Sequence, residues 1–158
     1  MTVEIERKFL FSELPPGVTD CKSIQQAYLQ PHPDRSVRVR ITTLAHGQSM
    51  AHLSVKGPLS GAFSRHEFEY EIPVVDAEAL LAICDHPPIM KKRYIFPHEN
   101  HCWELDVFAG ANAGLMVAEV ELQSEQEPLI LPPFVRTEVT GDKRYFNLAL
   151  AYKPFTTW

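Results

Sequence analysis

Cysteine is scarce in this chain of 158 residues, which contains Cys21, Cys84 and Cys102 and no Cys-x-x-Cys pair. An odd number of widely spaced thiols gives neither a disulfide framework nor a zinc site, so we expect reduced thiols and a cytoplasmic location. Long apolar runs are missing as well, since no stretch approaches the roughly 18 residues that a membrane helix needs. A charged residue as early as Glu4 argues against a secretory signal peptide. We therefore expect no membrane partner.

An excess of positive charge is absent too. The chain has 15 Lys and Arg residues against 20 Asp and Glu residues, a formal net charge of -5. Proteins that bind nucleic acids usually present a basic face, so we do not expect a nucleic-acid partner. The hydrophobic content of 45% and the charged content of 22% are ordinary for a globular protein. The length predicts a single domain over residues 1–158.

What the chain does contain is alternation of polar and apolar residues, which is typical of β-strands because successive side chains point to opposite faces. Turns with Gly, Pro or Asn separate several of these segments and favour antiparallel pairing. The predicted strands are residues 1–10, 24–30, 36–42, 50–56, 65–72, 89–96, 102–108 and 115–122. We predict a mainly β, α+β fold, and eight antiparallel strands are enough to close a barrel.

Two segments follow a helical pattern instead. Residues 76–84 begin with Asp76, which can cap a helix, and Pro87-Pro88 prevents the helix from extending further. A second, short helix is predicted over residues 143–151, after Gly141-Asp142. These helices and the proline-rich connection 128–133 are the candidates to cover the apolar faces of the strands.

The other face of the strands carries nearly all of their charge. It consists of Glu4, Glu6, Lys8, Arg38, Arg40, Lys56, Arg65, Glu67, Glu69, Glu71, Lys91, Arg93, Glu104, Asp106, Glu119 and Glu121. For any single strand, a solvent-exposed polar face is the ordinary interpretation. In a small sandwich, however, the apolar faces would then meet each other and leave the helices little to cover. We therefore favour a closed barrel with the charged face turned inward and the helices packed outside.

Energetics limit what such a lumen can be. Burying one ion in a dry interior costs several kcal/mol, so the sixteen charged groups would exceed a typical folding stability of about 5–15 kcal/mol. The lumen must therefore be hydrated, internally paired and suited to a charged ligand. Carboxylates beside basic groups suit a small polyanion that is held by Arg and Lys and bridged to the carboxylates by a divalent metal.

The ordered series of motifs resembles one family, the CYTH superfamily of triphosphate tunnel metalloenzymes. The series comprises Glu4-x-Glu6-x-Lys8, Arg38-x-Arg40, Lys56-Gly57, Glu67-x-Glu69-x-Glu71, Lys91-x-Arg93, Asp106 and Glu119-x-Glu121. The first motif alone is weak evidence, but the series extends over residues 4 to about 150. The resemblance implies an eight-stranded tunnel that binds a triphosphate together with Mg²⁺ or Mn²⁺.

The resemblance also implies roles for individual residues. The implied metal ligands are Glu4, Glu6, Glu119 and Glu121. The implied phosphate-binding residues are Lys8, Arg38, Arg40, Lys56, Lys91 and Arg93, with Lys143 and Arg144 of the last helix at the tunnel mouth. The remaining carboxylates, Glu67, Glu69, Glu71 and Asp106, would either orient the basic residues or bind a second metal. Lys8 binds a phosphate or helps to activate water in this scheme, and we hypothesise that Tyr28 forms a hydrogen bond with it and shares that role.

The family contains inorganic triphosphatases, thiamine triphosphatases, RNA triphosphatases and class IV adenylyl cyclases, which share the tunnel. A compact chain fits hydrolysis of inorganic triphosphate to pyrophosphate and phosphate best. A class IV adenylyl cyclase and a nucleoside or thiamine triphosphatase are the alternatives. A non-catalytic polyphosphate- or nucleotide-binding module is a further alternative, against which the intact set of carboxylates argues. The sequence leaves open whether the chain forms a homodimer.

Overall fold

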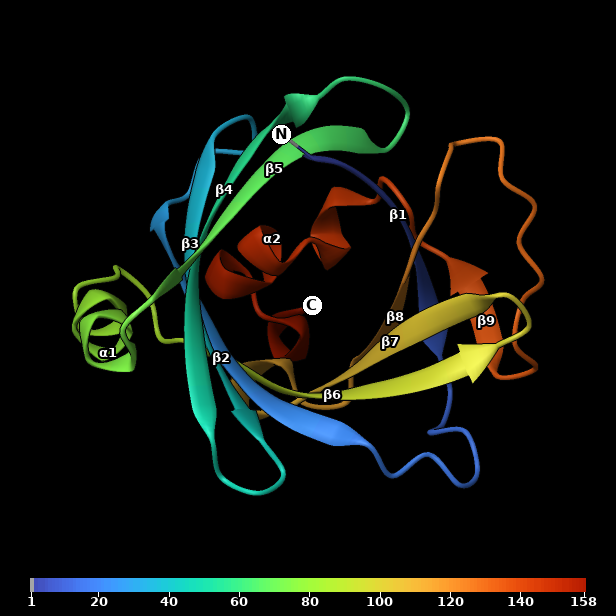
Figure 1. Cartoon of the computed structure of the whole chain (residues 1–158), viewed down its shortest axis with the longest axis horizontal. Helices are drawn as coiled ribbons and strands as arrows, with labels where there is room; N and C mark the ends of the chain where they lie inside the picture. Colours follow the sequence, from blue (N-terminus) through green and yellow to red (C-terminus); the bar gives the residue numbers. More distant parts are fainter. Residues whose placement is uncertain (1) are drawn as a thin grey trace.

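The computed structural model describes residues 2–158, and its strands form a closed ring (Figure 1). The strands are β1 (Thr2–Phe11), β2 (Cys21–Gln30), β3 (Ser36–Leu44), β4 (Ser49–Leu59), β5 (Ser64–Ile72), β6 (Ile89–His98), β7 (His101–Phe108), β8 (Met116–Glu121) and β9 (Val135–Glu138). The helices are α1 (Val74–Ala82) and α2 (Asn147–Tyr152), with short 3-10 helices at Gly110–Asn112, Lys143–Tyr145 and Phe155–Thr157. Met1, which the first predicted strand included, lies outside the described residues.

Antiparallel pairing in the order β5-β4-β3-β2-β6-β7-β8-β1 builds the ring, and pairing of β1 with β5 closes it. β1 is long enough to serve both neighbours, because residues 2–5 pair with β5 and residues 6–10 pair with β8. The eight-stranded antiparallel barrel predicted from the alternation is therefore confirmed. No described helix is long and apolar enough to cross a membrane.

The ninth strand, β9, was not predicted. It pairs with the second half of β1, outside the ring. Its four residues directly follow Pro132, Pro133 and Phe134, and four residues are too few to show an alternating pattern. β9 and the connection before it help to cover an aromatic cluster on the outer face of the barrel, in which Phe9 and Trp103 lie 5.5 Å apart between ring centroids.

α1 lies outside the barrel, as predicted. Its buried residues Ala77 and Leu81 pack against outward-facing residues of β2, β3 and β4, among them Ala27 and Val39. The helix therefore removes this part of the outer sheet surface from water.

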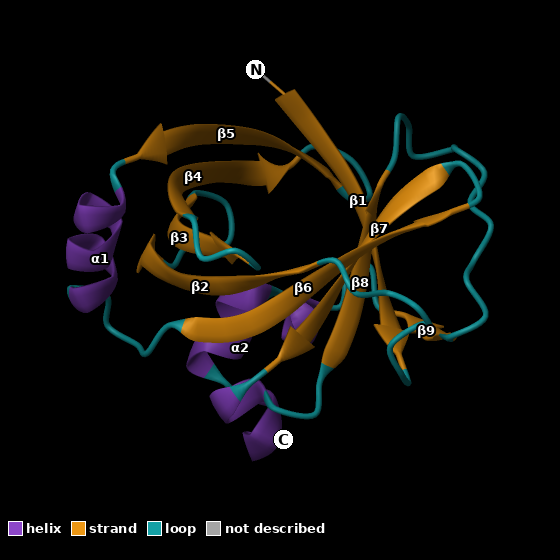
Figure 2. Ribbon diagram, turned by 60° about the horizontal axis from the view of Figure 1, so that its bottom comes forward, coloured by secondary structure: helices purple, strands orange, loops and turns teal. Residues whose placement is uncertain are grey.

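α2 does not lie outside the barrel, contrary to the expectation for both helices. Figure 2 shows it at one end of the barrel, where its fully buried Leu150 packs against Ile89, Phe108 and Val117. Val117 pairs with Leu10 of β1, and Leu10 lies two residues after Lys8, so both apolar side chains point to the same inward face as Lys8. The inward face thus changes from charged to apolar along the strands, and the apolar end requires a cover, which α2 provides.

Candidate active site

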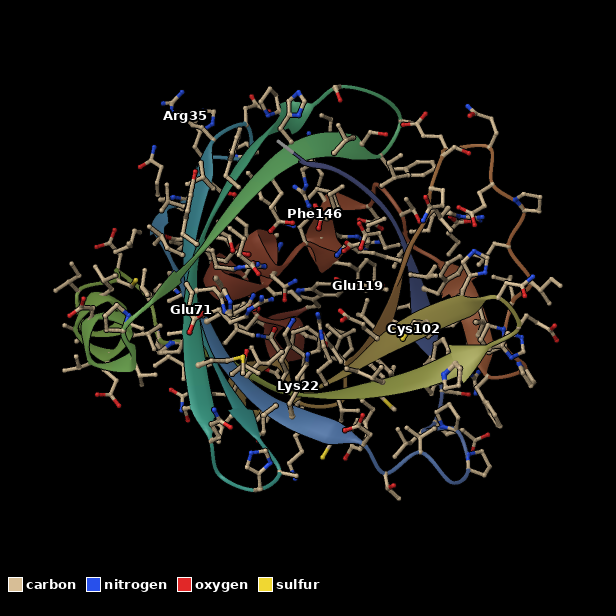
Figure 3. The ribbon with its side chains drawn as sticks, in the orientation of Figure 1. Lys22, Arg35, Glu71, Cys102, Glu119 and Phe146 are labelled. Carbon is tan, nitrogen blue, oxygen red and sulfur yellow. The ribbon has the colours of Figure 1, made fainter. Side chains whose placement is uncertain are left out.

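A cavity of about 570 Å³ occupies the charged part of the barrel interior. Its lining includes eight carboxylates, from Glu4, Glu6, Glu67, Glu69, Glu104, Glu119, Glu121 and Glu127, and six cations, from Lys8, Arg38, Arg40, Lys56, Arg65 and Arg93. The start of α2 contributes Phe146, Asn147 and Leu148 to its wall. Figure 3 shows the side chains of Glu119 and Phe146 inside the ring of strands.

The first cluster in this cavity joins β1 to β8. Strand register places Lys8 opposite Glu119 and Glu6 opposite Glu121. The Lys8 Nζ donates to Glu119 and lies 2.9 Å from Oε1 of Glu6. Burial opposes the charge on Lys8, but Glu119 and Glu6 outweigh it and raise the Lys8 pKa. Burial and the nearby Glu119 raise the pKa of Glu6, although Lys8 offsets part of this effect.

The second cluster joins β1 to β4 and β5. Lys56 Nζ donates to both oxygens of Glu4 at 2.7 and 2.8 Å, and Arg65 Nε donates to Oε2 at 3.1 Å. Burial opposes ionisation of Glu4, but these two cations outweigh it and lower its pKa to about 2. Glu4 is therefore a carboxylate, with two basic residues held beside it.

The third cluster lies across β3, β4 and β5. Arg40 Nη2 lies 3.2 Å from both carboxylate oxygens of Glu69. Ser54 Oγ donates to Glu69 at 2.8 Å and accepts from Arg38 Nη2 at 3.2 Å. Arg38 Nη2 also lies 3.6 Å from Glu67. The two arginines predicted to bind phosphate are thus paired with carboxylates of β5.

The fourth cluster is the most deeply buried and joins β6 to β7. Arg93 donates to both oxygens of Asp106, at 2.7 and 2.8 Å, and to Glu119 at 3.1 Å. Lys91 donates to Asp106 and, at 3.2 Å, to Asn147 of α2. The side chains of Lys91 and Asp106 are both 1% exposed. Burial and the neighbouring Arg93 lower the pKa of Lys91 to about 8, although Asp106 opposes this shift.

Comparisons with known proteins agree with this architecture. The model of the CYTH domain family matches residues 2–146. The chain belongs to the CYTH domain family. An inorganic triphosphatase from Acetivibrio thermocellus is 41% identical over 161 residues, which cover 98% of this chain and 97% of that protein. A second one, from Nitrosomonas europaea, is 38% identical over 152 residues, covering 94% and 96%.

Solved structures show the same fold. A crystal structure of an inorganic triphosphatase has a TM-score of 0.66 at 35% identity, and the match covers 96% of this chain and 95% of that one. A putative adenylyl cyclase from Hippeastrum has a TM-score of 0.52 at 16% identity, covering 78% and 80% of the two chains. At that identity the likeness concerns the fold alone.

Most of the residues singled out by the CYTH motifs meet in the cavity. The predicted residues that line it are Glu4, Glu6, Lys8, Tyr28, Arg38, Arg40, Lys56, Glu67, Glu69, Arg93, Glu119 and Glu121. Arg65 lines it as well, although the sequence predicts only that it lies on the charged face and predicts no role for it. Its position two residues before Glu67 was the signal that could have identified it.

Five predicted residues lie outside the cavity lining. Lys91 and Asp106 form a buried pair behind the wall, so Lys91 does not face the cavity as a phosphate ligand would. Glu71 is exposed near the end of β5. Lys143 is exposed, and Arg144 pairs with Asp142 and has a 68% exposed side chain. Lys143 and Arg144 belong to a 3-10 turn that ends before Phe146, and Phe146 is the first residue of this segment that lines the cavity. The expected reach of Lys143 and Arg144 into the tunnel mouth is therefore not seen.

Tyr28 lies in the cavity wall, but no hydrogen bond to Lys8 is seen within the described residues. Burial raises the pKa of Tyr28, while the nearby cations Arg38 and Lys8 partly offset the effect. The phenol therefore keeps its proton at neutral pH and is a hydrogen-bond donor. The backbone N–H of Tyr28 donates to Nε2 of His86 at 3.2 Å.

The donor chemistry of the CYTH cavity fits a hard divalent cation, since Mg²⁺ and Mn²⁺ prefer carboxylate oxygens. Glu6 and Glu121 are opposite each other on β1 and β8, with Glu4 and Glu119 two residues away on the same strands. Among residues 2–158 no group of three potential ligands is already assembled. Three of the four carboxylates are instead bound to Lys or Arg, which must release them before they can hold a metal.

Proposed function

We propose that this chain hydrolyses inorganic triphosphate to pyrophosphate and phosphate, with Mg²⁺ or Mn²⁺ as the cofactor. Relatives named inorganic triphosphatase, 38% and 41% identical over nearly their whole length, support this assignment. The three cysteines are free, which supports the cytoplasmic location expected from the sequence.

The observation that carries the proposal is the charge balance of the cavity. Eight carboxylates face six cations there, so the cavity has no surplus positive charge. A triphosphate would add several negative charges to a partly buried space, where unbalanced charge is costly. The ligand must therefore enter with divalent cations that balance both the phosphates and the carboxylates.

The carboxylates that would hold the metal are Glu4, Glu6, Glu119 and Glu121. A bound divalent ion would neutralise phosphate oxygens and lower the pKa of a bound water, which supplies a nucleophile at neutral pH. The chain's own cations would then exchange their carboxylate partners for phosphate oxygens. Arg38 and Arg40 offer planar forks for this purpose, and Lys56 offers a point charge.

Lys8 is a cation and a donor in this site rather than a base. Glu119 and Glu6 raise its pKa above the usual value for lysine, so it keeps its proton at neutral pH. We infer that Lys8 stabilises charge on a phosphoryl oxygen during the reaction. Tyr28, which is also protonated, would donate a second hydrogen bond in the same region. Tyr28→Phe is expected to lower turnover with unchanged metal affinity, and full turnover would contradict this role.

The decisive experiment compares phosphate release from inorganic triphosphate, ATP and thiamine triphosphate, beside an assay for cyclic AMP. We expect the highest kcat/KM for inorganic triphosphate and no cyclic AMP. Glu4→Gln and Glu119→Gln should each abolish metal-dependent release while the fold persists. Glu78→Gln, on the exposed surface of α1, is the matched control and should behave as the native chain. Preferred hydrolysis of ATP or thiamine triphosphate would overturn the assignment, as would cyclic AMP formation.

A further inference from the structure

Gln26 of β2 is a buried residue whose polar atoms have no partner. It is 1% exposed, and neither its Oε1 nor its Nε2 forms a hydrogen bond within residues 2–158. Buried side-chain amides in folded proteins almost always have partners, so each exception requires an explanation. A group that is needed only when a ligand is bound is one such explanation.

Figure 1 shows β2 and β3 side by side in the barrel wall. Their register places Arg40 of β3 directly opposite Gln26. Directly opposite side chains on one face of an antiparallel pair are close neighbours. The Nε–H of Arg40 is also buried without a partner, although its Nη2 is paired with Glu69. One side chain thus has a spare donor, and its neighbour has a spare acceptor.

We propose that Gln26 is a positioning residue for Arg40: its Oε1 accepts the Arg40 Nε–H when the guanidinium group leaves Glu69 to bind the triphosphate. This inference rests on the proposed function. Arg40 lines the cavity and Gln26 does not, so Gln26 acts from behind the arginine and without touching the ligand. A neutral amide suits this task, because it orients the guanidinium group without neutralising the charge that binds phosphate.

His52 is the alternative acceptor, because it lies opposite Arg40 on the other side and its Nδ1 is also unpaired. Gln26 is favoured because it is more deeply buried and both of its polar atoms lack partners. Nothing in the described structure satisfies the amide of Gln26 in the absence of a ligand. An unsatisfied buried amide lowers stability, and a hydrogen bond from Arg40 in the bound state would satisfy it.

Gln26→Met tests this idea, because methionine has a similar size and cannot accept the hydrogen bond from Arg40. We expect the affinity for an imido analogue of triphosphate, measured by calorimetry with Mg²⁺, to fall about ten- to a hundredfold. The Tm of the ligand-free variant should be equal to or higher than that of the native chain, because an unsatisfied polar group has been removed. Gln25→Met is the matched control, since Gln25 is exposed on the opposite face of β2, and it should change neither quantity.

A double-mutant cycle with Arg40→Lys separates positioning from a purely structural role, because lysine has no Nε–H that corresponds to the arginine donor. Gln26→Met should cost less than about twofold in affinity in the Arg40→Lys background. In the native chain, the ¹⁵Nε–¹H resonance of Arg40 should move when the analogue binds, and this shift should be lost in Gln26→Met.

Unchanged affinity in Gln26→Met would overturn the inference, as would a lowered Tm or an equal loss of affinity in the Arg40→Lys background. If Gln26→Met does not fold, an Arg40 Nε–H resonance that stays in place when the analogue binds to the native chain would overturn it. Failure of the native chain to bind the analogue at all would instead refute the proposed function.

Discussion

At the scale of single residues, Arg93 holds three carboxylates in place, because it binds Asp106, Glu104 and Glu119 at once. Arg93→Met is expected to lower the free energy of unfolding by about 3–5 kcal/mol, since the buried carboxylates of Asp106 and Glu119 each lose one of their counterions and the hydrogen bonds that it donates. Lys91→Met is the control, and it should cost less because Asp106 keeps both bonds from Arg93. Urea unfolding followed by circular dichroism measures both, and equal losses would contradict this ranking.

The buried pair also predicts a pH dependence. Burial opposes ionisation of Asp106, but Arg93 and Lys91 outweigh it and keep its pKa below the usual 3.8. Such a group stabilises the fold at pH values above its unfolded pKa, and this contribution disappears as the pH falls through the folded pKa. Asp106→Asn should therefore be less stable than the native chain at pH 7, and the difference should shrink toward pH 3. A difference that is constant across urea unfolding at pH 7, 5 and 3 would contradict this mechanism.

At the residue scale, the sequence predicts which face of its strand each side chain occupies, but it does not predict how deeply that side chain is buried. Alternation correctly placed Lys91 and Arg93 on one face. It could not show that Asn147 and Asp106 would enclose Lys91 while Arg93 lines the cavity, because those contacts depend on α2 and on the neighbouring strand. The unpaired amide of Gln26 was likewise beyond prediction, since a lone Gln in an alternating strand carries no signal.

Among the elements, α2 determines where the cavity ends. Leu150→Ala should lower the free energy of unfolding by about 2–5 kcal/mol, because Leu150 is fully buried against the apolar end of the barrel. Leu148→Ala is the matched control: Leu148 is only partly buried and lines the cavity, so its loss should cost clearly less. Thermal unfolding of the two variants provides the comparison, and a smaller loss for Leu150→Ala would show that α2 is not needed to close this end.

Element positions were predictable where the pattern was long. The eight barrel strands each show enough alternation to be recognised, whereas β9 has four residues and no pattern. The placement of α2 failed for another reason. Leu10, Phe108 and Val117 continue the inward parity of strands that carry charge on the same face, so the pattern of charges alone predicts a lumen that is charged throughout and needs no apolar cover.

At the scale of the whole molecule, the barrel pairs its charges internally when no ligand is bound. Adding Mg²⁺ alone or a triphosphate analogue alone should raise the Tm only slightly, because each meets groups that are already paired. Adding both should raise the Tm by more than the sum of the separate shifts, since ligands stabilise the state that binds them. Differential scanning fluorimetry measures this, and Glu119→Gln should lose the extra shift. Additive shifts in the native chain would contradict the coupled entry of metal and phosphate.

The most direct test follows inorganic triphosphate by ³¹P NMR in the presence of the purified chain. With Mg²⁺ or Mn²⁺, we expect the triphosphate signals to be replaced by phosphate and pyrophosphate in equal amounts. With excess EDTA, the triphosphate should remain intact. Cleavage that continues in EDTA, or no cleavage with either metal, would contradict a metal-dependent triphosphatase in this barrel.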